Sequence, residues 1–354
     1  MATDFNKIPH GKIIFCFIVL LSFTIYSFNR SQKSSLKKLA GITMGVIPYN
    51  ITLNTNKSNN ELKKIHKLIE EFLKSFDFEF SNYKPKSFIN RLNKLSVNEK
   101  LKSSKRFIFM IKESQRLFEM SKGAFDPTVS PLINLWGFGE KPKKIETITK
   151  ADVQSVKSKI GFESIKLFDN EIMKEKNISI NLSAIAKGYA VDLIAEILDN
   201  HDIKDYLVEI GGEVLSKGYK PNGEQFRIGI EIPKNNKDGF YEKFDVIVNL
   251  DNKAIATSGN YRNYYEKDGK RYSHIIDPRT GYPADNKIAR VTVIADRCAW
   301  ADGLATTLMV LDIKEGLKLI DSLPGVEALF SIRSEEGKFE MKSTLGFNKF
   351  IEKN

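Results

Sequence analysis

The amino-acid sequence predicts an α+β fold, in which runs of strands and runs of helices follow one another without strict alternation. Hydrophobic residues recur at helical spacing in several segments of the first half and near the C-terminus. The stretch 206–294 is instead rich in short strand-like segments that glycine turns separate. After residue 42 there is no second linker, low-complexity block or internal repeat. We therefore expect one domain with mixed or antiparallel sheets and flanking helices, preceded by an N-terminal hydrophobic anchor.

The composition narrows the range of partners. The 354 residues are 42% hydrophobic and 28% charged, which is ordinary for a globular protein. The net charge of +11 could indicate nucleic acid, but the lysines are scattered and form no stripe interleaved with aromatic residues. We expect no nucleic-acid partner and favour anionic lipid or an anionic substrate. The two cysteines and four histidines are dispersed, so neither a disulfide framework nor a zinc site is expected.

The run 13–28 is apolar and contains no charged residue. It is short for a membrane-spanning helix and long for the core of a signal peptide. No small-residue cleavage motif follows it, and Cys16 lacks the small preceding residue of a lipoprotein site. We expect an uncleaved signal-anchor and polar linker in residues 1–35, with the linker itself at 29–40, and a folded domain in residues 36–354. The flanking basic residues do not fix the orientation of the anchor.

In chain order, the first elements expected are a strand at 44–53, which Pro48 makes irregular, and an amphipathic helix. The apolar residues of this helix, at helical spacing, are Leu62, Ile65, Ile69, Phe72, Leu73 and Phe76. Ser87 can cap the short helix that comes next. A longer helix at 104–121 ends before Gly123, because glycine is a normal C-terminal signal.

The second half begins with strands near 164–168 and 178–182, followed by a helix at 183–198. The strand-rich stretch comes next, and its turns are expected at Gly211-Gly212, Asn222-Gly223 and Asp268-Gly269. The last two are the strongest hairpin signals in the chain. The elements that complete the fold are helices at 298–311 and 314–322 and two strands that flank residues 334–338.

The segment 272–283, with sequence YSHIIDPRTGYP, carries one of the four histidines. His274 ends an apolar alternation and precedes a turn that contains proline and glycine. Histidine can exchange a proton near neutral pH, and Asp277 could orient its ring. The alternative is a turn that joins two strands, in which His274 and Asp277 are simply paired. The segment alone supports the two interpretations about equally.

The segment 181–190 resembles a strand end that leads into a helix. Ser183 occupies the expected N-cap position, and the free amides of a helix start attract anions such as phosphate. Lys187 would lie one turn into the helix, within reach of such a phosphate. The alternative is a capped helix with a surface lysine, and this segment alone favours it. The glycine spacing of a Walker motif is missing.

Asp302 and Thr306 are four residues apart, which places them on one face of the expected helix. A carboxylate and a hydroxyl in this arrangement can both offer oxygen to Mg²⁺, which takes few protein ligands beside phosphate and water. The alternative is that Asp302 caps the helix and Thr306 bonds to the preceding turn. Taken in isolation, the pair favours this alternative.

Three glycine-containing segments are ambiguous. The segments 123–128 and 135–139 could hold a planar heterocycle between backbone amides, an acid and aromatic rings, or could form a tight turn with a small satellite core. In the segment 210–213, two glycines permit close approach to a ligand or merely a kink between strands.

Together these segments resemble the ApbE-like flavin transferases (FAD:protein FMN transferases), and they occur in the order found in that family. The resemblance spans about residues 40–350. The matching pieces are Met44 with Gly45, 81–83, 123–127 with 135–139, 182–192, 210–213, 256–262, 274–283 and 301–306. It implies an enzyme that uses Mg²⁺ to cleave FAD and attaches FMN through a phosphoester bond to a threonine or serine hydroxyl of a target protein, releasing AMP.

The resemblance also implies roles for individual residues. His274 would be the base that takes the proton from the acceptor hydroxyl, and the backbone carbonyl of Ala184 with the side chains of Asp302 and Thr306 would hold Mg²⁺. The residues that would contact FAD are Met44, Tyr83, Ala124, Phe125, Asp126, Asn181, Lys187 and Ile276. Many relatives have Asp where this chain has Asn181, which keeps hydrogen bonding but removes a charge near the metal.

Two other functions are compatible with these residues. An FAD pyrophosphatase would produce FMN and AMP with the same metal and base, while a non-catalytic FAD-binding protein would need neither His274 nor Asp302. The resemblance further implies an acceptor flavoprotein, either a membrane redox subunit or an exported protein. It places the protein in the bacterial cytoplasmic membrane, with a single-pass anchor and a catalytic domain on the periplasmic side.

Overall fold

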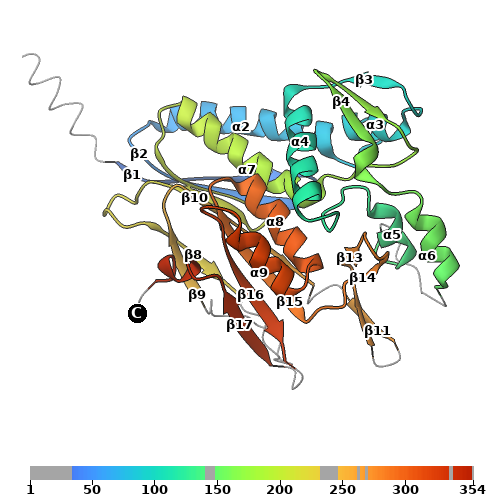
Figure 1. The fold of residues 1–354 in the computed structure, drawn as a ribbon. Coiled ribbons are helices and arrows are strands. Elements are labelled where there is room, and N and C mark those ends of the chain that lie inside the picture. The colour runs from blue at the N-terminus through green and yellow to red at the C-terminus, as the bar shows by residue number, and fades with distance from the viewer. Residues whose placement is uncertain are drawn as a thin grey trace, which may run out of the picture.

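The computed structural model describes residues 34–139, 148–231, 246–260, 264–267, 270–334 and 338–352. Its centre is an eight-stranded sheet (Figure 1). Every neighbouring pair in this sheet is antiparallel. In spatial order the strands are β1 (Ser35–Thr43), β2 (Ile47–Thr55), β6 (Asp205–Ile210), β7 (Glu213–Lys217), β10 (Lys253–Gly259), β15 (Ile288–Ala295), β16 (Glu327–Arg333) and β17 (Phe339–Ser343). The sheet and its helices confirm the α+β class.

Helices cover one face of this sheet (Figure 1). They are α2 (Asn59–Phe80), α4 (Lys105–Met120), α7 (Ser183–Asn200), α8 (Cys298–Val310) and α9 (Ile313–Asp321). Most residues of α7 and α8 are buried, as expected for helices that are apolar around most of their circumference. The amphipathic α2 begins with a capping box formed by Ser58 and Glu61, and Ser104 caps α4.

A strand hairpin covers part of the opposite face. It consists of β8 (Phe226–Ile230) and β9 (Val246–Leu250), which pair with each other in a separate sheet. Apolar side chains of the hairpin, including Val248, pack against side chains of the large sheet, including Ile294, in a second buried cluster. The large sheet is therefore buried on both sides at this position.

The remaining elements are short helices, 3-10 turns and short strands outside the large sheet. The short helices are α3 (Phe88–Lys94), α5 (Ser130–Leu135) and α6 (Lys150–Lys157), with two 3-10 turns, Phe162–Ser164 and Phe347–Lys349. The short strands are β3 (Lys100–Lys102), β4 (Ile165–Phe168), β5 (Glu171–Lys174), β11 (Tyr264–Lys267), β12 (Lys270–Ser273), β13 (Ile276–Asp277) and β14 (Tyr282–Pro283). A third buried cluster, which includes Trp136 and Ile276, joins α5 and α6 to the β13–β14 turn.

The helices α7 and α8 approach each other most closely at Gly188. A Cβ atom at this position would lie 2.3 Å from the carbonyl oxygen of Cys298, so only glycine allows the contact. Near this contact, Asp192 of α7 accepts hydrogen bonds from the backbone N–H groups of Cys298 (2.7 Å) and Ala299 (3.1 Å). The N-cap residue of α8, Arg297, makes no side-chain cap. The Asp192 carboxylate of the neighbouring helix therefore caps the start of α8.

Most of the expected helices and turns are confirmed. Ser87 caps α3, and α4, α7, α8 and α9 occur close to the expected positions. Gly211 and Gly212 form the β6–β7 turn, with φ angles of 59° and 102°. Asn222-Gly223 is also a turn, but the strands on its two sides, β7 and β8, belong to different sheets.

Three expectations about strands were wrong or incomplete. The linker expected at 29–40 overlaps β1, and the strand expected at 44–53 starts later, as β2, after a turn at Met44 and Gly45. Residues 178–182 form no strand. The strand that pairs with β4 is β5, earlier in the chain, whereas the alternating pattern had suggested a strand at 178–182. The turn Asp268-Gly269 and the apolar run 13–28 lie outside the described residues. Within the described ranges, no helix has the length and apolar character needed to cross a membrane.

Candidate functional site

A pocket of about 370 Å³ lies where α7 begins, α8 ends and β10 stops. Eight of the twelve residues expected at the site line it, and they come from separate parts of the chain. They are Ala124, Phe125, Asp126, Asn181, Ala184, His274, Ile276 and Thr306. Ser258 and Gly259, at the end of β10, complete the wall beside His274. The fold therefore assembles most of the site that the sequence predicted.

The other four expected residues lie outside the lining of this pocket. Tyr83 is 80% exposed and lines an adjoining groove of about 830 Å³, which shares Ser130, Ile133 and Asn181 with the pocket. Met44 lies in the β1–β2 turn with a φ of 46°. The remaining two are Lys187 and Asp302, which lie between α7, α8 and the β6–β7 turn.

Asn181, not Ser183, provides the side-chain contact at the start of α7. The residue in the N-cap position is Leu182, which makes no side-chain cap, so the expectation for Ser183 was wrong. The Asn181 Oδ1 atom accepts a hydrogen bond from the Ser183 N–H (2.9 Å), and the Asn181 N–H donates to the Pro127 carbonyl (2.8 Å). Asn181 thus joins the helix start to the segment at 124–127 across the pocket.

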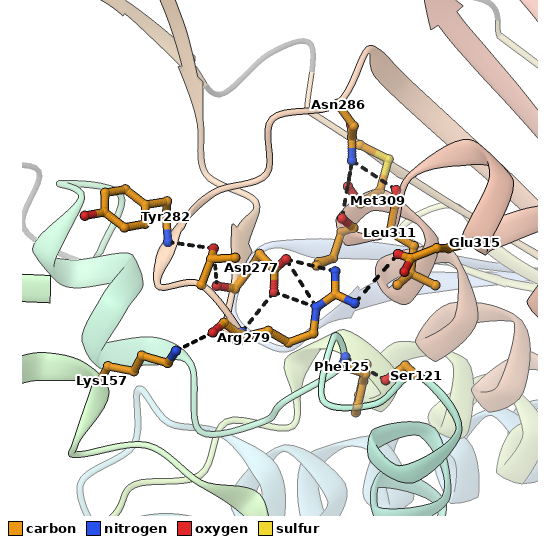
Figure 2. Close-up of polar contacts among 12 residues, drawn as sticks. Ser121, Phe125, Lys157, Asp277, Arg279, Tyr282, Asn286, Met309, Leu311 and Glu315 are labelled. Atoms are coloured by element: carbon orange, nitrogen blue, oxygen red, sulfur yellow. Dashed lines mark hydrogen bonds and ion pairs between the residues drawn. The ribbon is translucent and has the colours of Figure 1, made fainter. Parts of the chain in front are cut away.

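The segment that carries Asp126 is held by its own hydrogen bonds. The Asp126 Oδ1 atom accepts from the N–H (2.7 Å) and the hydroxyl (2.6 Å) of Thr128, and Ser121 Oγ accepts from the Phe125 N–H (2.9 Å; Figure 2). Burial raises the pKa of Asp126, although the bonds from Thr128 oppose this change. The Asp126 carboxylate is consequently a fixed acceptor at the pocket wall.

Asp302, one of the expected cation ligands, accepts a hydrogen bond from the backbone of the neighbouring helix α7. The Gly188 N–H donates to Asp302 Oδ2 (3.0 Å), whereas its regular acceptor in an α-helix would be the Ala184 carbonyl. Asp302 is 3% exposed, and Thr306 one turn further along α8 contacts the Ser258 hydroxyl (3.3 Å). The expected alternative, in which Asp302 caps α8, does not apply, because the N-cap residue is Arg297. The hydroxyl that donates to a carbonyl of the preceding turn is that of Thr307, which bonds Gly303 (2.7 Å). Thr306 lines the pocket.

Glu213 is a site residue to which the sequence analysis gave no role. It forms an ion pair with Lys187, is 2% exposed, and its Oε2 atom has no hydrogen-bond partner among the described residues. Burial, followed by the charge of Asp302, raises the pKa of Glu213 to about 8, while Lys187 opposes this change. The sequence signal that could have identified Glu213 is its position directly after the two glycines of a hairpin turn.

This cluster contains more acidic side chains than basic ones. Burial opposes the charge on Lys187, but the carboxylates of Asp302 and Glu213 outweigh it and raise the Lys187 pKa. Two buried acidic side chains thus share one ammonium group, and the Glu213 Oε2 atom has no hydrogen-bond partner among the described residues. This surplus of acceptors suits an additional cation. No group of three or more His, Cys, Asp or Glu side chains converges in the described part of the chain, so phosphate and water would complete such a site.

His274 faces the pocket from the segment after β12. Its ring is 6.4 Å from the Phe138 ring, centroid to centroid, and Phe138 in turn stacks on Tyr265 at 5.4 Å. Trp136 belongs to the third buried cluster and its Nε1–H donates to the Gly281 carbonyl (2.9 Å). The segment 135–139 therefore supplies both a satellite core and, through Phe138, a wall of the adjoining groove.

Asp277 does not have the partner that we expected. Its carboxylate binds the Arg279 guanidinium in a two-point contact (Figure 2), which replaces the expected pairing with His274. Arg279 also lies 3.7 Å from Glu315 of α9, and Lys157 of α6 donates to the Arg279 carbonyl. The segment after His274 is thus fixed to two helices.

The chain belongs to a known class of proteins, the ApbE family, whose sequence model matches residues 44–330. A Vibrio cholerae protein named FAD:protein FMN transferase is 36% identical over 316 residues, which cover 89% of this chain and 92% of the relative. A Haemophilus influenzae protein of the same name is 34% identical over 330 residues, 91% of this chain and 93% of the relative.

Solved structures show the same relationship. The flavin transferase ApbE from Vibrio cholerae has a TM-score of 0.80 to this chain at 34% identity, over 90% of this chain and 99% of that one. The apo form of the Pseudomonas stutzeri flavinyl transferase ApbE has a TM-score of 0.79 at 34% identity, over 90% and 97% of the two chains. The similarity therefore extends over nearly the whole described domain.

Proposed function

We propose that this protein is an FAD:protein FMN transferase, which attaches FMN from FAD to a threonine or serine hydroxyl of an acceptor protein and requires Mg²⁺. The observation that carries the proposal is the convergence of His274, Ala184 and Thr306 on one pocket from three separate elements. Curated relatives with the transferase name, 30–36% identical over most of the chain, support it.

The proposed reaction transfers the FMN group of FAD from the pyrophosphate to the acceptor hydroxyl. The acceptor hydroxyl oxygen attacks the phosphorus on the FMN side of the pyrophosphate, and the bond between that phosphorus and the bridging oxygen breaks. FMN becomes esterified to the acceptor, and AMP leaves with the bridging oxygen. His274 takes the proton from the hydroxyl, a role that contributes roughly 10²–10⁴-fold in rate.

The residues present fit a divalent cation. Asp302, the Thr306 hydroxyl and the Ala184 carbonyl would hold it. The Gly188 N–H, whose regular helical acceptor would be the Ala184 carbonyl, donates to Asp302. The nearby Glu213 Oε2 atom has no hydrogen-bond partner among the described residues. When bound, Mg²⁺ would neutralise charge on the pyrophosphate oxygens. The structure gives Asp302 a fixed orientation for this purpose through the Gly188 contact.

FAD would occupy the pocket and the adjoining groove together. Asn181 borders both cavities, and Tyr83 presents an exposed ring in the groove. The segment with Ala124, Phe125 and Asp126 would contact the dinucleotide on one side, and Ile276 on the other. In this arrangement Lys187 is withheld from the pocket by its ion pair with Glu213, so it would contact a phosphate only by leaving that partner.

The location of the protein is part of the proposal. The apolar run 13–28 would anchor it in the bacterial cytoplasmic membrane, with the catalytic domain on the periplasmic side, where membrane redox subunits and exported proteins are available as acceptors. The charge of +11 suits a domain held close to anionic lipid. Protease treatment of intact spheroplasts checks this: degradation of the domain without lysis supports it, and protection until lysis contradicts it.

The central test is acceptor labelling. The full-length protein is incubated with FAD, MgCl₂ and a library of 11-residue peptides with a central threonine, and the peptides are then weighed. A mass gain equal to FMN minus water, absent in His274→Ala and strongly reduced in Asp302→Asn, is the expected result. His201→Ala is the matched control, because His201 lies at the end of α7 and bonds its own helix at the Ile197 carbonyl (2.9 Å).

The alternatives give different products. Free FMN and AMP without labelled peptide would identify an FAD pyrophosphatase. FAD that stays bound and intact, with the same affinity in His274→Ala, would identify a binding protein. Either result contradicts the transferase assignment.

A further inference from the structure

A second cavity is lined by Ser273, the residue that precedes the proposed base His274. This groove of about 520 Å³ is lined by Asn260, Ser273, the segment 284–289, Arg333 and Ser334. Most of its lining residues are polar or charged, namely lysine, arginine, aspartate, asparagine and serine. The proposed function leaves it without a role.

The pocket and the groove share two thin walls. At the end of β10, Gly259 lines the pocket and the next residue, Asn260, lines the groove. After β12, Ser273 lines the groove and His274 lines the pocket. At both positions neighbouring residues of the chain line different cavities, so His274 lies at the boundary between the two cavities.

The floor of the groove is held in place by amide side chains. Asn286 Nδ2 donates to the Met309 (2.9 Å) and Leu311 (3.1 Å) carbonyls at the end of α8 (Figure 2), and Asn260 Nδ2 donates to the Ile288 carbonyl (3.0 Å). The Arg333 N–H donates to the Lys287 carbonyl (2.8 Å). Because α8 also carries Thr306, the groove and the pocket are built on the same helix.

We infer that this groove binds the acceptor polypeptide, as an extended segment that places its threonine or serine hydroxyl beside His274. This inference rests on the proposed function, which requires a second substrate at His274. The pocket and the adjoining groove with Tyr83 accommodate FAD, which leaves the opposite side of His274 for the acceptor. A polar groove suits a polypeptide backbone, which has a donor and an acceptor at each residue.

The charges in the groove indicate the sequence of the acceptor. Lys287 and Arg333 provide two positive charges and Asp285 one negative charge. Since opposite charges guide and align a bound segment, residues beside the acceptor hydroxyl are expected to be acidic or small. The groove therefore selects among hydroxyl-bearing segments, whereas the pocket selects the flavin nucleotide.

The experiment separates acceptor binding from FAD binding. The peptides most strongly labelled by the wild-type protein in the threonine-centred library are resynthesised, and KM and kcat are measured for each with FAD in excess. Ala284→Trp fills the groove without removing a hydrogen-bonding side chain. Met341→Trp, at an exposed position of β17, introduces the same ring outside the groove as the matched control.

The expected result is a rise of about tenfold or more in the peptide KM of Ala284→Trp. The FAD dissociation constant, and FAD hydrolysis without peptide, should stay within about twofold of wild type. A second variant, Lys287→Glu, reverses the charge of an exposed side chain. It should lower kcat/KM for acid-flanked peptides more than for lysine-flanked peptides, and Lys342→Glu on β17 should not.

The outcomes are distinguishable. Absence of peptide labelling by the wild-type protein would overturn the proposed function itself. Labelling by the wild-type protein, combined with an unchanged peptide KM in Ala284→Trp and an unchanged peptide preference in Lys287→Glu, would overturn the groove assignment alone. Because Lys287 is exposed at the surface, this second variant decides the question even where the tryptophan variant folds poorly.

Discussion

Arg279 binds Asp277 at two points, with 3.0 Å from Nε to Oδ1 and 2.9 Å from Nη2 to Oδ2 (Figure 2). The Arg279 N–H also donates to Asp277 Oδ1 (2.9 Å). This contact closes the turn that follows His274, and the guanidinium extends from it toward Glu315 of α9. The position of the candidate base thus depends on an ion pair located three to five residues further along the chain.

Replacing Arg279 by lysine should lower kcat for peptide labelling by about tenfold, because an ammonium group cannot reproduce the two-point contact. The FAD dissociation constant should change little, since Arg279 does not line the FAD pocket. Kinetics with saturating FAD measure the first quantity and fluorescence titration the second. Glu315→Gln is the control with a smaller expected effect, because its contact of 3.7 Å is exposed. An unchanged kcat in Arg279→Lys would show that the turn holds without the contact.

Gly188→Ala should destabilise the fold by about 3 kcal/mol. The new Cβ would lie 2.3 Å from the Cys298 carbonyl oxygen, and backbone at a helix start cannot move aside as a side chain can. Urea unfolding measures the change. Gly316→Ala on α9 is the matched control, since its Cβ would lie 3.1 Å from the flexible Leu308 side chain and alanine favours helix. Similar losses in the two variants would contradict a specific role for the α7–α8 contact.

Asp192 should make stability depend on pH in the mildly acidic range. Burial raises its pKa from 3.8 to about 6, although the N–H groups of Ala299 and Cys298 oppose this change. Because the folded pKa is higher than the unfolded one, the folded state binds the proton more tightly. The resulting contribution, on the order of 3 kcal/mol, is fully present below about pH 4 and is lost as the pH rises through 6.

The measurement is the difference in unfolding free energy between the wild-type protein and Asp192→Asn from pH 4 to pH 7. The wild-type advantage should shrink as the pH rises to 6 and then become constant, since asparagine does not titrate. Asp321→Asn at the exposed end of α9 is the matched control for the substitution. A difference that grows with pH would mean that the two N–H groups at the start of α8 outweigh burial.

Lys187 and Glu213 should be coupled in stability. Lys187→Met leaves Glu213 and Asp302, which are 2% and 3% exposed, without a cation, and should cost about 3–5 kcal/mol. The double variant Lys187→Met/Glu213→Gln removes one of these charges as well, so it should cost less than Lys187→Met alone. A double-mutant cycle by urea unfolding measures the coupling. Additive costs would contradict a shared buried cluster.

Local patterns in the sequence were sufficient for most elements, because caps and periodicity depend on neighbouring residues. Ser87 caps the short helix as expected, and the longer helix begins after Ser104, close to the expected start. Local patterns were insufficient where the partner is distant. β1 lies within a segment that is polar enough to suggest a linker, and it is a strand because β2 pairs with it along its whole length.

The same distinction applies to the site. The sequence by itself determined the chemical groups: a histidine before a turn, a carboxylate and hydroxyl four residues apart, and an amide before a helix. The tertiary structure alone decided their partners. Arg279 pairs with Asp277, and the Gly188 N–H donates to Asp302. Glu213 forms an ion pair with Lys187, which is 26 positions earlier in the chain. Pairing of this kind depends on which surfaces are buried together, and burial is a property of the folded chain.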